Sequence, residues 1–252
     1  MNSLSELLCG DYKNLDELSD ILSLLESTID TFSVRCFDFL KQDVPKDIAT
    51  LGAYCGRTLL EASCIAMIGR ITPYRLLLLK RYQEQPSYDL GVRHKISIEW
   101  KGDILPKSKI TKDQLWNKVE DKTLTSPLLS DYMWDICWIP AFKGLLLDMG
   151  NENYASLIDS ANIPPEGICQ KLRKEAEVLY SSLSKGIHQE FIIPHGVTYD
   201  EVTVQNLLQR TILLITQLAL ISHYIPIAVA SIDKTKLLQC LTGIEEEMGT
   251  LK

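Results

Sequence analysis

Apolar residues recur every three or four positions along most of the chain, which is the spacing of helices that bury one face. In residues 14–42 this pattern runs through Leu18, Leu22, Leu25 and Ile29, and acidic residues lie near its start, as the helix dipole favours. Further helical patterns cover about 165–189, 199–232 and 234–249. We therefore predict an all-α, multi-helix bundle of roughly eight to ten helices.

The segment 48–69 is the most apolar helix of the pattern, and its only charged residues are Arg57 and Glu61. A helix that is apolar on all sides has to be buried, so we expect this one at the centre of the bundle, with the 199–232 helix against it. Arg57 and Glu61 are four residues apart and share one helical face. Because a buried arginine needs a matching charge, we interpret them as a polar core pair; the alternative is that they line a polar pocket.

Proline residues mark the breaks between these helices. Thr72-Pro73 ends the central helix, and Pro73 suits the first turn of the next one, which closes by Pro86. Residues 86–111 contain glycines and one alternating stretch, 95–100, so we expect a small irregular insertion or linker with a possible strand there. A tryptophan-rich helix near 128–150 should be kinked at Pro140. We treat residues 1–252 as a single helical domain.

The run 211–232 has no charged residue and is long enough to span a bilayer. Thr216, Gln217, Ser222 and His223 lie within it, and each would need a partner in hydrocarbon. We favour a buried core helix over a membrane span.

Composition and charge set limits on function. The chain of 252 residues has a net charge of −7, which disfavours broad nucleic-acid binding and leaves nucleic acid as an indirect partner only. Its seven cysteines have no metal-binding spacing and suit a reduced, cytoplasmic protein. The first residues do not have the pattern of a signal peptide. We expect no metal and no cofactor, because phosphate loops, dinucleotide fingerprints and zinc-protease motifs are absent from the sequence.

Two clusters of polar residues are candidates for chemistry. Lys185 and His188 lie with serines on one face of the predicted 165–189 helix, where a histidine could act as an acid or base on a phosphodiester; we favour a solvated helix face. A basic cluster flanks the proline break and could contact phosphates or a partner, although a solvated face is again favoured; its members are Arg70, Arg75, Lys80 and Arg81. We therefore assign no catalytic residue.

Two segments together resemble a known family. The stretch 56–75 contains Arg57, Leu60 and Glu61 in the order Arg-x-x-Leu-Glu, and 179–191 contains Tyr-x-x-Leu-Ser-x-x-x-His ending at His188. These patterns resemble the core helix and the late helix of the HEPN-like helical bundles of prokaryotic conflict and phage-defence proteins. Catalytic members of that family carry an Arg four to six residues before the His, where this chain has serines and a leucine at 182–184.

The resemblance implies a degenerate bundle that does not catalyse a reaction. Its expected role is a helical accessory or scaffold subunit of a bacterial multi-protein anti-phage defence complex, acting through protein contacts. One alternative is a divergent, metal-independent ribonuclease that uses His188, with Arg57 or Lys185 steadying the phosphate. The other is a membrane-acting effector that spans the bilayer with 211–232.

Overall fold

A computed structural model describes residues 2–41, 45–89, 91, 97–107, 126–149, 164–186 and 199–249. Of these residues 78% are helical and none forms a strand, so the all-α prediction is confirmed. The nine helices of the described ranges are α1 (Ser3–Cys9), α2 (Glu17–Lys41), α3 (Pro45–Ile71), α4 (Pro73–Gln83), α5 (Asp131–Met133), α6 (Ile139–Met149), α7 (Pro165–Lys185), α8 (Glu201–Ser222) and α9 (Lys234–Gly249). The other described elements are η1 (Trp100–Ile104), a turn in which Lys101 and Gly102 have non-helical backbone angles, and the short π-helical turn η4 (Trp134–Trp138).

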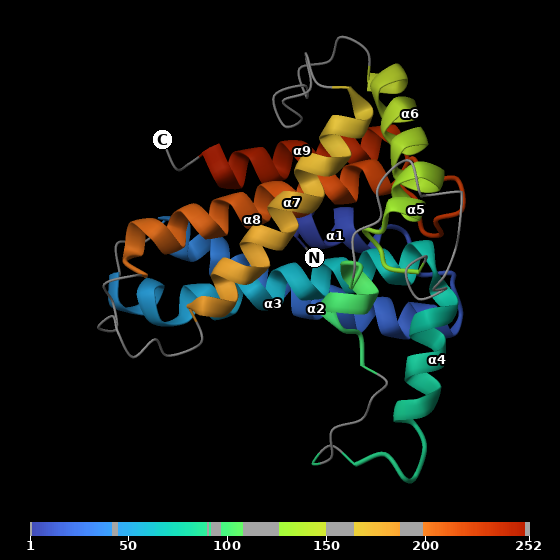
Figure 1. The fold of residues 1–252 in the computed structure, drawn as a ribbon, viewed down its shortest axis with the longest axis horizontal. Helices are drawn as coiled ribbons and strands as arrows, with labels where there is room; N and C mark the ends of the chain where they lie inside the picture. Colours follow the sequence, from blue (N-terminus) through green and yellow to red (C-terminus); the bar gives the residue numbers. More distant parts are fainter. Residues whose placement is uncertain are drawn as a thin grey trace.

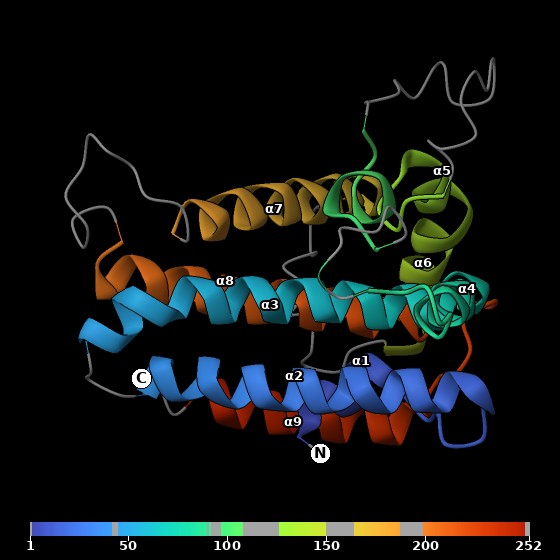
Figure 2. The same ribbon diagram turned by 90° about the horizontal axis from the view of Figure 1, so that it is seen from below.

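The helices form layers, with α3 and α8 in the middle (Figures 1 and 2). In Figure 2, α7 lies on one side of this pair, and α1, α2 and α9 lie on the other. Helix α3 packs against α2, α8, α7, α4 and α1. This central position confirms the prediction for 48–69, and it explains why α3 has so few charged residues.

Helices α3 and α8 run in the same direction and approach closely through glycines. A Cβ at Gly52 would lie 2.4 Å from Val204 Cγ1, and a Cβ at Gly56 would lie 2.7 Å from Leu208 Cδ2. A further contact near the end of both helices, between Arg70 and Ser222, has the same sequence offset of 152. The constant offset keeps the two helices in register over most of α3, and the missing side chains allow their backbones to come close together.

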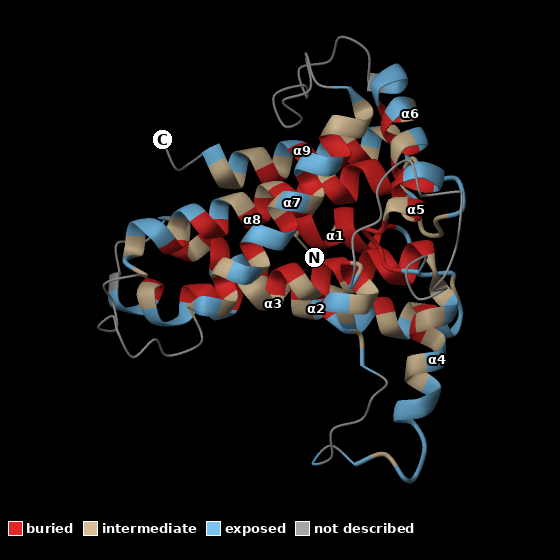
Figure 3. Cartoon of the chain, in the orientation of Figure 1, coloured by how far each residue is buried: buried red, intermediate tan, exposed pale blue. Residues whose placement is uncertain are grey.

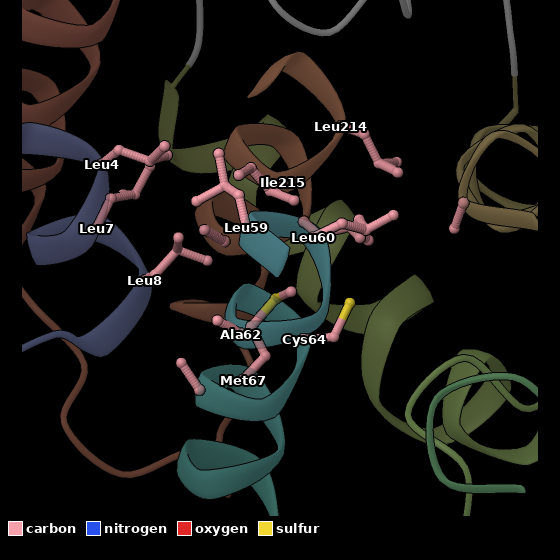
Figure 4. Close-up of a cluster of buried hydrophobic side chains, with 14 of the residues drawn as sticks. Leu4, Leu7, Leu8, Leu59, Leu60, Ala62, Cys64, Met67, Leu214 and Ile215 are labelled. Atoms are coloured by element: carbon pink, nitrogen blue, oxygen red, sulfur yellow. The ribbon is translucent and has the colours of Figure 1, made fainter. Parts of the chain in front are cut away.

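The core is continuous across these layers. Figure 4 shows Leu4, Leu7 and Leu8 of α1 beside Leu59 and Met67 of α3, and Leu214 and Ile215 of α8 on another side of α3. The labelled leucines and Met67 are almost completely buried, and Figure 3 shows buried residues concentrated where α1, α3 and α8 meet. Burial of apolar side chains at this density is the main source of stability for such a bundle.

The tryptophan-rich helix is distorted just before Pro140, close to the predicted kink. Its chain follows a π turn in which the Ile139 N–H donates to the Trp134 carbonyl, five residues back. Because proline has no N–H, the regular helical ladder is interrupted next to it. The Trp138 side chain is fully buried, and its Nε1 donates to the Leu128 carbonyl at 2.9 Å.

Two sequence predictions need correction. Helix α8 ends at Ser222 and not near 232, because Pro226 excludes helical geometry from Ile225 and the chain turns at His223. The insertion at 86–111 is irregular as predicted, but Trp100, Ile104 and Leu105 are buried in the core, so 97–107 is not a free linker.

The strand suggested by the alternation at 95–100 does not form in its described part, 97–100. Residues 108–125 lie outside the described residues.

Gly10 provides the sharpest test of the packing at the end of α1. It has a φ of +69°, and a Cβ there would lie 1.8 Å from the Ala230 carbonyl oxygen. We expect Gly10→Ala to lower the free energy of unfolding by about 3 kcal/mol or more, because both the backbone conformation and the neighbouring backbone resist a side chain. Urea denaturation measures the effect.

Gly144→Ala is the matched control for Gly10→Ala. A Cβ at Gly144, inside α6, would meet only Tyr224 at 3.8 Å, so its effect should lie within about 1 kcal/mol of zero. A Gly10→Ala protein as stable as Gly144→Ala would contradict the close packing of α1 against the 223–233 segment.

Candidate functional site

Arg57 and Glu61 form the predicted pair, but they lie at the edge of the core. Arg57 Nε donates to Glu61 Oε1 at 3.3 Å, and the two side chains are 25% and 36% exposed. The prediction of a buried core pair is therefore wrong in its location. Both side chains are therefore partly in water, although they belong to the central helix α3.

The Arg57 side chain also binds α7. Its Nη2 donates to the Tyr180 hydroxyl at 2.9 Å, and its guanidinium lies 4.8 Å from the centre of the Tyr180 ring. Trp100 of η1 stacks on the same ring at 4.1 Å, nearly parallel to it. Tyr180 thus holds α3, α7 and the 97–107 segment together.

The charges around Tyr180 favour a structural role for this cluster over a catalytic one. Burial raises the pKa of Tyr180, while Arg57 lowers it and Glu61 raises it. The phenol therefore stays protonated at neutral pH. With the Arg57 guanidinium shared between Glu61 and Tyr180, and with a carboxylate beside it that repels anions, this cluster offers no free nucleophile or base.

The fully buried arginine of α3 is Arg70, which the sequence analysis placed in a surface cluster for phosphates or a partner. Its exposed fraction is 0%, so Arg70 cannot contact a phosphate or a partner from the surface. No carboxylate in the described part of the chain forms an ion pair with it. Burial lowers the pKa of Arg70 only to about 10, and the side chain therefore stays charged at neutral pH.

Backbone oxygens and neutral side chains take the place of a counter-ion for Arg70. Nε donates to the Val229 carbonyl at 3.2 Å, and Nη1 donates to Ser222 Oγ at 2.9 Å and to the Leu8 carbonyl at 3.5 Å. The Leu8 carbonyl belongs to the last turn of α1, where unpaired carbonyls and the helix dipole favour a cation.

His223 completes this network. Its Nε2 lies 2.7 Å from the Leu7 carbonyl, which can only accept, so Nε2 carries the hydrogen. Nδ1 then accepts from Arg70 Nη2 at 2.8 Å and from the Ile232 N–H at 3.2 Å. Burial lowers the pKa of His223 to about 3, and the charge of Arg70 contributes to this shift. His223 is thus a buried histidine whose two ring nitrogens both have hydrogen-bond partners.

The rest of the basic cluster forms ion pairs within the chain. Arg75 pairs with Asp103 of the 97–107 segment and donates to the Ser126 carbonyl at 3.0 Å. Lys80 pairs with Asp20 at 3.1 Å, and Arg81 pairs with Glu17. These carboxylates neutralise the cations, so the arrangement favours the solvated-face interpretation over a phosphate site.

The proposed acid–base face on α7 is only partly described. Lys185 is the exposed last residue of α7, and Ser184 Oγ donates to the Tyr180 carbonyl at 2.6 Å within the helix. No contact joins Lys185 to Arg57 among the described residues. His188 lies outside the described residues, so both the favoured solvated face and the alternative acid–base role of His188 stay untested.

Groups that could bind a metal do not gather in the described ranges. No cluster of three or more His, Cys, Asp or Glu residues forms there. All seven cysteines are buried and none forms a disulfide, and burial raises the pKa of Cys9 and Cys169 to about 12. The Cys9 and Cys169 thiols are therefore inert hydrophobic groups at neutral pH.

One described helix is long and apolar enough to cross a bilayer. It is α8, and 67% of its most apolar window is buried within the protein. The apolar run 211–232 is not a single helix, since α8 ends at Ser222, so a span made of that run is not formed.

No family model, no curated protein and no solved structure matches this chain. The geometry of the described side chains is therefore the basis for a functional proposal.

The two arginines of α3 should differ sharply in their effect on stability. Arg70→Met leaves buried carbonyl groups and Ser222 without their donor, so we expect it to lower the free energy of unfolding by about 3–5 kcal/mol. Arg57→Met breaks a partly exposed pair and should cost about 1 kcal/mol. Urea denaturation of both variants measures the difference, and equal losses would contradict the assignment of Arg70 as the buried charge.

His223 should make stability depend on pH. The ordinary pKa of histidine is 6.5, and the pKa of His223 in the folded protein is about 3. Between these pH values His223 is protonated in the unfolded chain and neutral in the folded protein. This contribution is complete above pH 6.5 and is lost as pH falls towards 3, by about 1.4 kcal/mol per pH unit.

His223→Gln removes the titrating group and keeps an amide that can donate and accept. Below pH 6.5 the variant should lose stability less steeply than the wild type, as measured by urea denaturation at several pH values. The comparison of slopes also corrects for the carboxylates, which titrate in both proteins. Parallel slopes would rule out a neutral, buried His223.

Proposed function

We propose that this protein is a non-catalytic helical subunit that acts by binding another protein. The polar residues of α3 that were candidates for a catalytic or binding role instead form contacts between helices. The observation that carries the proposal is an exposed apolar face on the tryptophan-rich helix α5–η4–α6. Exposed apolar faces of this kind mark sites of protein–protein contact.

The outer face of this helix follows helical spacing through Ile136, Pro140, Lys143 and Leu147, and Leu146 lies beside it. Ile136, Leu146 and Leu147 are 59%, 43% and 86% exposed. The opposite face of the same helix is buried through Trp138, Phe142 and Leu145. The outer residues are therefore presented on a firmly packed helix, which costs a partner little ordering entropy on binding.

The resemblance to HEPN-like bundles suggests which kind of protein the partner is. Modules of that kind stand beside an effector nuclease or ATPase, so we propose that the partner is a subunit of a bacterial anti-phage defence complex in the cytoplasm. The net charge of −7 and the internally paired basic residues support a protein partner over direct binding of nucleic acid.

The proposal is tested by purifying the tagged protein at its native expression level from its own host and identifying what co-purifies. We expect one defence-system subunit in fixed ratio, and we expect Leu147→Asp to reduce its recovery at least tenfold, because a charge replaces an interface side chain. Val202→Asp is the control: Val202 is 72% exposed at the start of α8, away from α6 (Figure 1), and should leave recovery unchanged.

A second measurement addresses the ribonuclease alternative. The purified protein alone should leave RNA intact. Degradation of RNA that disappears in His188→Ala would overturn the non-catalytic proposal, as would recovery of the same partner by Leu147→Asp in undiminished amount.

A further inference from the structure

Helices α2 and α3 pack side by side in opposite directions (Figure 2). Near the start of α2, a Cβ on Gly69 would lie 3.3 Å from Leu22 Cδ2. Further along α2, the rings of Phe32 and Tyr54 lie 5.9 Å apart in an edge-to-face contact. Residue numbers thus rise along α2 as they fall along α3, and these two contacts fix which positions of the two helices face each other.

The same register brings two cysteines together. Cys36 lies 14 residues after Leu22, and Cys55 lies 14 residues before Gly69. Because helices packed side by side keep residues at multiples of seven on their facing sides, Cys36 faces Cys55 as Leu22 faces Gly69. Cys36 is completely buried, as a position inside such a contact requires. Burial raises the pKa of Cys36, and the charge of a Cys55 thiolate raises it further, which is an effect of near neighbours.

Small side chains on α3 keep the two helices close along this line. Ile29 and Ala62, each seven residues from its cysteine towards the Leu22 contact, are also buried, so α3 has Gly69, Ala62 and Cys55 at its three contact positions. Packed helix axes lie about 8–10 Å apart and each Cα lies about 2.3 Å from its axis, so directly facing Cα atoms are roughly 4–6 Å apart. A disulfide joins residues whose Cα atoms are about 4.4–6.8 Å apart, so facing cysteines at this contact meet its requirement.

We propose that Cys36 and Cys55 are a reversible oxidation site, at which peroxide converts the two thiols into a disulfide between α2 and α3. Both thiols are free in the structure, as the reduced state requires. The inference goes beyond the proposed function, because it concerns the response of the bundle to an oxidant and involves no partner protein.

Cys55 reacts first, because it is the least buried of the seven cysteines, with an exposed fraction of 7%. Burial raises its pKa, and the charge of Arg35 lowers it. The Cys55 thiolate attacks one oxygen of hydrogen peroxide, so that the O–O bond breaks, a sulfenic acid forms and hydroxide leaves. The Cys36 thiol then attacks the Cys55 sulfur: the S–S bond forms, the S–O bond breaks, and the oxygen leaves as water with the Cys36 proton. The two thiols lose two electrons, and the peroxide is reduced to two waters.

Disulfide mapping after peroxide treatment tests the proposal. The folded protein is treated with hydrogen peroxide, free thiols are blocked, and disulfide-linked peptides are identified by mass spectrometry. We expect the Cys36–Cys55 link to exceed any other cysteine pair at least tenfold and to disappear on treatment with dithiothreitol. Cys55→Ala should abolish the link. Cys64→Ala is the matched control, since Cys64 is another fully buried cysteine of α3, and it should leave the link unchanged.

Urea denaturation provides the second measurement. The midpoint of unfolding should be higher for the oxidised than for the reduced protein in the wild type and in Cys64→Ala, because the bond restricts the unfolded chain; Cys55→Ala should show no such increase. A folded wild type that forms no Cys36–Cys55 link under peroxide, a link that forms only after unfolding, or a midpoint that oxidation leaves unchanged would overturn the inference. None of these results affects the proposed contact at α6, which is tested by partner recovery.

Discussion

The arrangement of the helices depends on one buried charge, the guanidinium of Arg70. An unpaired ion inside a protein is costly, and Arg70 meets that cost with carbonyl oxygens, a hydroxyl and a neutral imidazole. These acceptors come from α1, from the end of α8 and from the 223–233 segment. The charge is solvated only when all three are in place, so Arg70 fixes the N-terminal helix, the central helix and the C-terminal segment relative to one another.

Close backbone contacts surround this charge and limit what the interior can do. Gly52 and Gly56 bring α3 against α8, and Gly10 brings the end of α1 against the Ala230 carbonyl. Apolar side chains fill most of the remaining space, and the polar groups of the buried network around Arg70 bind one another. The interior between α3 and α8 is therefore occupied by structural contacts. The surfaces open to a partner are the outer faces of the peripheral helices.

The sequence was sufficient to predict the fold class and the central helix, because a long segment with only two charged residues can be stable only when it is buried. It was not sufficient to identify which arginine is buried. Arg57 and Arg70 lie on different sides of α3, and the choice depends on neighbours far away in sequence, such as His223. The clue was present in the charge-free run around Ser222 and His223, whose polar groups need a partner inside the core. For the candidate site, periodicity placed Lys185 and His188 on one helix but carried no information on which tertiary contacts they make.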